Sequence, residues 1–192
     1  MKSAFDEGYA EFGRLDFILA NAGIVRFAAE DGDEFARIWQ DIIDTNLTGV
    51  FHTVRAGLRA VIDGGRGGSI VITSSSAGIK GTGSPNAGAQ AYTAAKRGLV
   101  GYMQTLANDL APRMIRVNTI HPTGVVSGMT QNEALAEKAA QRGSEIAQMQ
   151  NALPIEILQP EDIANAVAWL LSDQASYVTG IQLPLDAGFC VR

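Results

Sequence analysis

Tyr92 and Lys96 are the two residues of this chain whose types and spacing most directly suggest chemistry. Four positions apart on a helix, their side chains project from one face about one turn apart. A phenol has a pKa of about 10, and a nearby ammonium ion favours the phenolate. The pair could therefore act as a general base that takes a proton from a bound substrate. Taken alone, such a pair is more often two residues on a partly exposed helix face.

Two further polar features precede this pair. Ser74-Ser75-Ser76 directly follows an apolar run, and Asn46 lies in a long helix-compatible stretch. Each has an ordinary explanation, because serines at a strand end often cap or turn the chain and a helical asparagine is often only solvated. Their value as site residues depends on the elements that position them.

Hydrophobic periodicity predicts alternating helices and strands, which is typical of α/β proteins. The expected strands cover residues 15–20, 69–73, 115–120 and 181–185, and the expected helices cover 2–12, 34–62, 90–110, a polar flap at 129–150, and a helix that begins at Pro160. Near-continuous apolar runs are typical of parallel strands buried on both faces. We therefore expect one domain over residues 1–192, a doubly wound, Rossmann-like parallel sheet covered by helices.

Four short motifs complete the pattern, namely Asn21-Ala22-Gly23 after the first strand, Arg116-Val117-Asn118 leading to Pro122, Tyr177-Val178-Thr179-Gly180 before the last strand, and the serine, tyrosine and lysine above. In this order and spacing the chain resembles the short-chain dehydrogenase/reductase family from end to end. The resemblance implies a catalytic tetrad of Asn46, Ser75, Tyr92 and Lys96. Ala77-Gly78 places Ser75, rather than Ser74, in register with the family's serine.

The resemblance also implies a role for each residue. Tyr92 is the base, Ser75 donates a hydrogen bond to the substrate oxygen, Asn46 holds a water that connects Lys96 to solvent, and Lys96 contacts the nicotinamide ribose. The residues expected to bind the cofactor are Asn21, Ala22, Gly23, Tyr92, Lys96, Pro122, Val125 and Ser127. Strand ends are where such ligands lie.

The loop at residues 78–86 and the segment His121-Pro122-Thr123-Gly124-Val125 resemble the carveol-dehydrogenase-like, mycofactocin-associated branch. Thr123 stands where the family commonly has glycine, so the backbone beside the nicotinamide is expected to differ slightly. NAD is the expected cofactor, with NADP not excluded. The expected reaction interconverts a small hydrophobic secondary alcohol and a ketone.

By the same resemblance, Met1 falls in the helix before the family's fourth strand, so the first three strands and their glycine-rich phosphate loop are expected to be absent. Two hypotheses follow. The chain is either an oxidoreductase or a catalytically silent remnant that keeps only oligomerisation surfaces. As written, it is expected to bind NAD(H) weakly and to lack turnover.

Composition excludes several other classes. A net charge of −5 without a basic cluster disfavours nucleic acid, and no apolar run approaches the roughly 20 residues that span a bilayer. His52, His121 and a lone cysteine, Cys190, give no metal cluster or disulfide, and no serine lies in a nucleophile elbow. Both histidines are interpreted as structural. We expect a cytoplasmic homo-oligomer, a dimer or tetramer, because Leu99, Met103 and Leu106 need covering.

Overall fold

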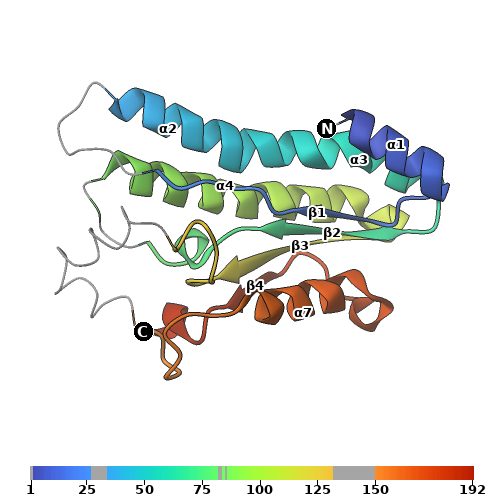
Figure 1. The fold of residues 1–192 in the computed structure, drawn as a ribbon. Helices are drawn as coiled ribbons and strands as arrows, with labels where there is room; N and C mark the ends of the chain where they lie inside the picture. The colour runs from blue at the N-terminus through green and yellow to red at the C-terminus, as the bar shows by residue number, and fades with distance from the viewer. Residues whose placement is uncertain (1, 27–33, 82–83, 85, 132–149) are drawn as a thin grey trace.

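The computed structural model describes residues 2–26, 34–81, 84, 86–131 and 150–192 (Figure 1). Its strands are β1 (Phe17–Ala20), β2 (Gly68–Thr73), β3 (Ile115–Pro122) and β4 (Gln182–Leu185), and its α-helices are α1 (Lys2–Phe12), α2 (Phe35–Ile43), α3 (Gly49–Gly64), α4 (Ala87–Leu110) and α7 (Pro160–Leu171). Short helical turns lie at η1 (Asp44–Thr48), η2 (Ser76–Gly78), η3 (Ala111–Arg113), η5 (Asp173–Ala175) and η6 (Phe189–Val191).

The described strands form one parallel sheet in the order β1-β2-β3-β4. Ile18 pairs with Ile70, and Ile70 with Val117, so equivalent points of the strands lie side by side. The segments between the strands supply the crossovers that parallel pairing requires. This confirms the predicted α/β class, and it brings the carboxyl ends of all four strands to one edge of the sheet.

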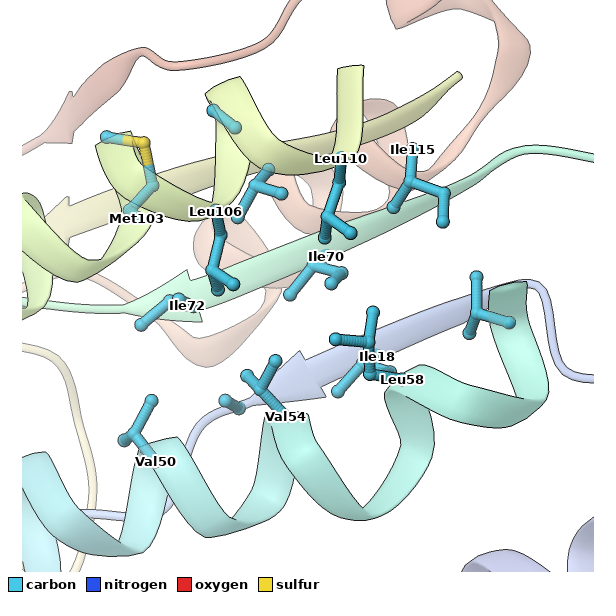
Figure 2. Close-up of a cluster of buried hydrophobic side chains, with 14 of the residues drawn as sticks. Ile18, Val50, Val54, Leu58, Ile70, Ile72, Met103, Leu106, Leu110 and Ile115 are labelled. Carbon is cyan, nitrogen blue, oxygen red and sulfur yellow. The ribbon is translucent and has the colours of Figure 1, made fainter. Parts of the chain in front are cut away.

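Helices α3 and α4 cover one face of the sheet and bury the larger apolar cluster (Figure 2). Val50, Val54 and Leu58 of α3 meet Ile18 and Ile70 of the sheet in this cluster. Leu99, Met103 and Leu106 of α4 are buried in the same cluster. The expectation that these three residues need a second subunit to cover them is therefore wrong, because the chain's own core covers them; self-association itself stays a prediction.

The opposite face of the sheet is covered by α7, which packs Val167 and Leu170 against Val71 and Ile120. Strand β1 departs from the expected burial on both faces. Ile18 and Ala20 are buried, but Phe17 and Leu19 on the other face are 52% and 44% exposed. In the described part of the chain α7 reaches β2 and β3, and nothing comparable covers this face of β1.

The expected helix over residues 34–62 is interrupted. It comprises α2 and α3, joined by the π-helical turn η1 at Asp44–Thr48. Such turns are frequent at functional sites. Asn46 lies in η1 and is fully buried, so the interpretation of this residue as a solvated helix asparagine does not hold.

Helix α4 begins at Ala87, slightly before the expected start at residue 90, because Asn86 caps it. The Asn86 side chain accepts hydrogen bonds from the backbone N–H groups of Gly88 and Ala89. Asparagine is among the preferred N-cap residues. The cap fixes the helix start that orients Tyr92 and Lys96.

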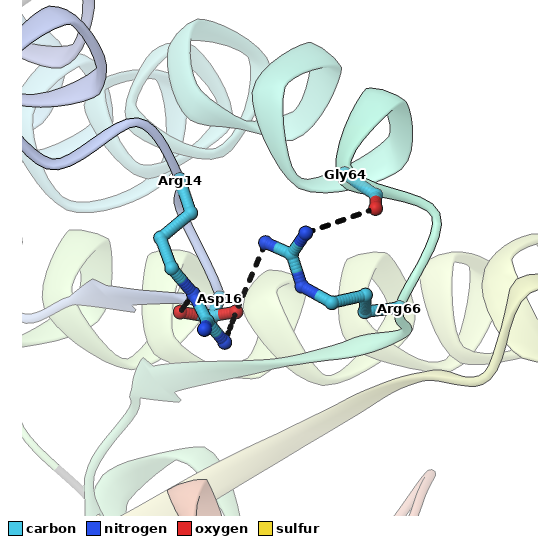
Figure 3. Close-up of polar contacts among 4 residues, drawn as sticks. All are labelled: Arg14, Asp16, Gly64 and Arg66. Carbon is cyan, nitrogen blue, oxygen red and sulfur yellow. Dashed lines mark hydrogen bonds and ion pairs between the residues drawn. The ribbon is translucent and has the colours of Figure 1, made fainter.

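An ion pair stabilises the end of the sheet opposite the strand carboxyl ends (Figure 3). Arg14 donates two hydrogen bonds to Asp16, at 2.7 and 2.6 Å, and Arg66 lies 3.7 Å from the same carboxylate. These contacts hold the pKa of Asp16 below its usual value, chiefly through the hydrogen bond from Arg14. Arg14 and Arg66 thus share the Asp16 carboxylate as a partner.

The predicted flap at residues 129–150 lies mostly outside the described residues, since 132–149 are not described. Its two flanks are joined at the base by a parallel bridge between Val125 and Leu158. Val126 N–H donates to Leu158 O, and Leu158 N–H donates to Gly124 O. This bridge fixes the backbone that follows Pro122 beside the strand ends.

Candidate active site

A cavity of about 810 Å³ lies at the carboxyl ends of the strands. Its lining includes nine residues proposed from the sequence, namely Asn21, Ala22, Gly23, Ser75, Tyr92, Lys96, Pro122, Val125 and Ser127. They come from segments up to about a hundred positions apart and converge on one hollow. Asn46 is the one proposed residue that does not line the cavity.

Ser75 and Tyr92 meet across this cavity. The Ser75 side chain caps the turn η2, where its Oγ accepts from Ala77 N–H at 3.2 Å, and it shares a side-chain hydrogen bond with Tyr92. Ser74 also lines the cavity, but its buried hydroxyl donates to the Lys96 carbonyl oxygen at 2.8 Å. The geometry therefore favours Ser75 over Ser74 as the serine that faces a substrate.

Lys96 is almost completely buried, with 2% of its surface exposed. Its Nζ donates to the Thr73 carbonyl oxygen at 2.8 Å and lies 5.6 Å from the centre of the Tyr92 ring. Burial lowers the pKa of Lys96 from 10.5 to about 8. At neutral pH the side chain still carries its proton.

The Tyr92 hydroxyl differs from the sequence-based expectation of a lowered pKa. Burial raises its pKa above the ordinary value of 10, and the hydrogen bond from Ser75 opposes part of this rise. Lys96 does not offset it, because the ammonium lies over the ring and donates to Thr73. In this state of the site, Tyr92 is a neutral phenol at pH 7.

The lowered pKa of Lys96 predicts a pH-dependent stability. Since the folded pKa of about 8 lies below the unfolded value of 10.5, the unfolded chain binds more protons between these two values, and stability rises with pH there. Relative to Lys96→Met, the wild-type chain should gain on the order of 3 kcal/mol as the pH rises from 7 to 10.5. Urea unfolding of both chains across this range is the measurement, and a constant difference would contradict the buried ammonium.

Asn46 holds the backbone that follows the Asn21-Ala22-Gly23 turn. Its Oδ1 accepts from Ile24 N–H at 2.7 Å, and its Nδ2 donates to Ile24 O at 2.8 Å. A Cβ atom on Gly23 would lie 3.3 Å from both Asn46 Oδ1 and Lys96 Nζ. The absence of a side chain at Gly23 thus lets Asn46 and Lys96 pack closely against this backbone.

The strand-end segments offer a suitable wall for a nicotinamide nucleotide. Asn21 and Ala22 lie exposed at the end of β1, and the Asn21 side chain bonds to Thr73 Oγ1 at 2.8 Å. Beyond Pro122, Ser127 Oγ donates to Val125 O at 3.1 Å. Lys96 lines the same cavity, so its ammonium is a suitable donor to a nicotinamide ribose there.

Several cavity residues were not proposed from the sequence. Thr130 orders the loop after Pro122, because its hydroxyl donates to Val125 O at 2.6 Å and accepts from Ser127 N–H at 3.0 Å. Apolar residues of α7 also line the cavity, namely Ile163, Ala164, Val167, Ala168 and Leu171. The sequence predicted that a helix begins at Pro160, but no local signal indicated which of its residues face the cavity.

Thr123, which replaces the common glycine, has specific partners. Its N–H donates to Leu185 O at 3.3 Å, and its Oγ1 lies 3.4 Å from Asn151 Oδ1. The side chain therefore links the segment after Pro122 to the chain that follows the undescribed residues. The expected difference in the backbone beside the nicotinamide stays a prediction.

Other kinds of site find little support in the part of the chain that the structure describes. No group of three or more histidine, cysteine or acidic residues could hold a metal ion there. None of the helices in the same residues is long and apolar enough to cross a membrane. Cys190 is a free thiol.

An open parallel sheet with polar groups converging at its carboxyl edge defines the Rossmann-like class of nucleotide-binding proteins. Residues 1–190 match the family model described as enoyl-(acyl carrier protein) reductase. An uncharacterized oxidoreductase of Mycobacterium tuberculosis is 51% identical over 187 residues, which cover 97% of this chain and 67% of the relative. The chain therefore belongs to the short-chain dehydrogenase/reductase family of oxidoreductases.

Two further relatives resemble the predicted branch. The (-)-trans-carveol dehydrogenase of Rhodococcus erythropolis is 43% identical over 195 residues, covering 97% of this chain and 69% of that enzyme. The crystal structure of carveol dehydrogenase from Mycobacterium avium in complex with NAD has a TM-score of 0.87 and 43% identity, with 100% of this chain and 70% of that chain covered. The predicted resemblance to carveol dehydrogenases is confirmed.

Proposed function

We propose that this protein interconverts a secondary alcohol and a ketone, with NAD as hydride acceptor or donor. The observation that carries the proposal is the meeting of Ser75, Tyr92 and Lys96 in one cavity at the strand ends. NAD is proposed because structures of two relatives, from Mycobacterium avium and Mycobacterium paratuberculosis, contain it. NADP remains an alternative for the same site.

In the proposed mechanism, Tyr92 exchanges a proton with the substrate oxygen. As a neutral phenol at pH 7, it already carries the proton that it gives to the forming alkoxide during ketone reduction. In the oxidative direction it accepts the alcohol proton, so this direction needs the phenolate. A bound nicotinamide supplies the hydride acceptor or donor.

The Ser75 hydroxyl holds the substrate oxygen next to Tyr92 and donates a hydrogen bond to the charge that develops on it. Lys96 places a positive charge beneath the Tyr92 ring and is held there by Thr73 O. We propose that Lys96, which lines the cavity, also contacts the nicotinamide ribose. Asn46 fixes the backbone of Ile24 through two hydrogen bonds. In the proposed mechanism it also holds a water that connects Lys96 to solvent.

The proposed substrate is a small hydrophobic alcohol or ketone. Much of the cavity lining is apolar, including Ile163, Val167 and Leu171 of α7 and Val126 of the loop after β3. Among the described lining residues Lys96 is the one with a charged side chain, and it is engaged with Thr73. Such a lining disfavours phosphorylated or polyanionic substrates. The carveol dehydrogenase relatives make a terpene-like alcohol a suitable first substrate to test.

Two neighbouring serines allow a matched test of this proposal. We call residues 1–192 joined to the glycine-rich phosphate-binding segment expected of the family the full chain. In the full chain, Ser75→Ala should lower kcat by about 10²-fold or more, because a hydrogen bond to the developing charge is lost. Ser74→Ala should leave kcat nearly unchanged but lower the free energy of unfolding by about 1 kcal/mol, because a buried hydrogen bond to Lys96 O is lost. Steady-state kinetics and urea unfolding of both variants distinguish the two serines. Equal loss of turnover in both variants would contradict the assignment.

A further inference from the structure

His121 is a fully buried histidine whose two ring nitrogens both have partners. Its Nδ1 lies 2.8 Å from the carbonyl oxygen of Ser75, and its Nε2 lies 2.9 Å from Thr119 Oγ1. A carbonyl oxygen can only accept, so the hydrogen must be on Nδ1. Nε2 then accepts from the Thr119 hydroxyl, whose other neighbour, Ile181 O, is more distant at 3.4 Å. The contacts select one neutral tautomer.

The environment keeps this ring neutral. Burial lowers the pKa of His121, and the positive charges of Arg97 and Lys96 lower it further, against the hydrogen bond with Ser75 O and the charge of Asp186. A neutral ring is suited to a fixed structural contact rather than to proton transfer. His121 does not line the cavity, whereas Pro122, the next residue, does.

The contact between His121 and Ser75 O lies where strands β2 and β3 end. The backbone ladder between β2 and β3 continues past Thr73 to Ser74, whose N–H donates to Ile120 O at 2.8 Å. At Ser75 the chain leaves β2 and enters the turn η2, and the Ser75 carbonyl accepts from Gly78 N–H at 2.8 Å and from the His121 ring. The histidine side chain thus extends the link between the two strands to the residue that bonds Tyr92.

We propose that His121 is a positioning residue that fixes the peptide of Ser75, and through it the Ser75 hydroxyl, relative to Tyr92. This inference rests on the proposed function, since it assigns His121 a part in the same site. It also revises the interpretation of His121 as merely structural. Small displacements of a catalytic group are enough to slow a reaction strongly, so a group that fixes Ser75 controls the rate.

Three substitutions at His121 separate this role from simple packing. His121→Leu removes the donor to Ser75 O, and His121→Gln places its amide near Thr119 instead. His121→Asn can place an amide N–H near the position of Nδ1 and so retain the donor. In the full chain, the first two should lower kcat by roughly 10- to 100-fold with little change in the KM for cofactor, and His121→Asn should recover most of the rate. His52→Leu, at an exposed histidine of α3, is the matched control and should leave kcat unchanged.

A double-mutant cycle with Ser75→Ala tests the route of the effect. If His121 acts through Ser75, His121→Leu should change kcat by less than about twofold when Ser75 is already alanine, because coupled residues are not additive. An equal fold-loss in both backgrounds would overturn the proposal. If Ser75→Ala itself leaves kcat unchanged, it is the proposed function that fails.

A spectroscopic readout tests the same link without turnover. The ionisation of Tyr92 can be followed by tyrosinate absorbance on the full chain, as the difference from Tyr92→Phe. Loss of the Ser75 hydrogen bond removes an interaction that lowers the pKa of Tyr92, so His121→Leu or His121→Gln should shift this ionisation to higher pH. His121→Asn should restore the wild-type midpoint. An unchanged midpoint in both His121→Leu and His121→Gln would overturn the proposal independently of catalysis.

Discussion

Replacing Tyr92 by phenylalanine in the full chain is expected to lower kcat by about 10²- to 10⁴-fold, which is the usual range for loss of a general acid or base. Phenylalanine keeps the ring that packs with Ile38, Ile42 and Ala91, so folding should be preserved. Only the hydroxyl and its bond with Ser75 are lost. Affinity for NADH, measured by calorimetry, should stay close to that of the wild type.

The chain offers a control for this variant. Tyr177 precedes the last strand and is 93% exposed, so Tyr177→Phe removes a phenol without touching the cavity. It should retain full turnover. Substantial turnover by Tyr92→Phe would remove the central residue of the mechanism.

The polypeptide of residues 1–192, purified by itself, is expected to bind NADH weakly and to show no alcohol-dependent turnover. A dinucleotide pyrophosphate is held by backbone N–H groups at a helix N-terminus. Helix α7 begins at the cavity, but Pro160 has no N–H, Asp162 N–H donates to Gln159 O at 3.1 Å, and the Asp162 carboxylate accepts from Gln159 N–H at 2.9 Å. Without a firm tether the nicotinamide loses the orientation that contributes several kcal/mol to catalysis.

The same polypeptide should be poorly soluble. Phe17 and Leu19 leave an apolar face of β1 open, and exposed edge strands of this kind promote association. Titration calorimetry with NADH tests the predicted weak binding by residues 1–192, with full-length carveol dehydrogenase from Mycobacterium avium as the positive control. Micromolar affinity together with turnover would contradict it. If both residues 1–192 and the full chain fold but show no turnover, the result would instead support a catalytically silent remnant.

Much of the fold could be predicted from the sequence because the local signals are strong. The apolar run Ser69–Thr73 and the β-branched strand near Ile115 are bounded by glycine or proline. Their order with intervening helices is enough to predict a parallel sheet. The burial of β1 could not be predicted, because an apolar run does not show whether a helix covers each of its faces.

The candidate site was predictable where short motifs carry the resemblance, as at Asn21-Ala22-Gly23 and the Tyr92 and Lys96 pair. The pKa of Tyr92 was not, because its sign depends on burial and on where the ammonium of Lys96 points. His121 was not identified either. Its partner lies 46 positions away on a neighbouring strand end, and only the register of β2 and β3 brings the two together.

Transfer of a labelled hydride tests the account most directly. The full chain is incubated with NAD and a small hydrophobic secondary alcohol that carries deuterium on the carbinol carbon, and the reduced cofactor is examined by mass spectrometry. The account predicts NADH that has gained one deuterium, at a rate that Ser75→Ala and Tyr92→Phe both suppress. A wild-type chain that binds NAD but transfers no deuterium from any such alcohol, or that transfers it equally well without Tyr92, would contradict the account.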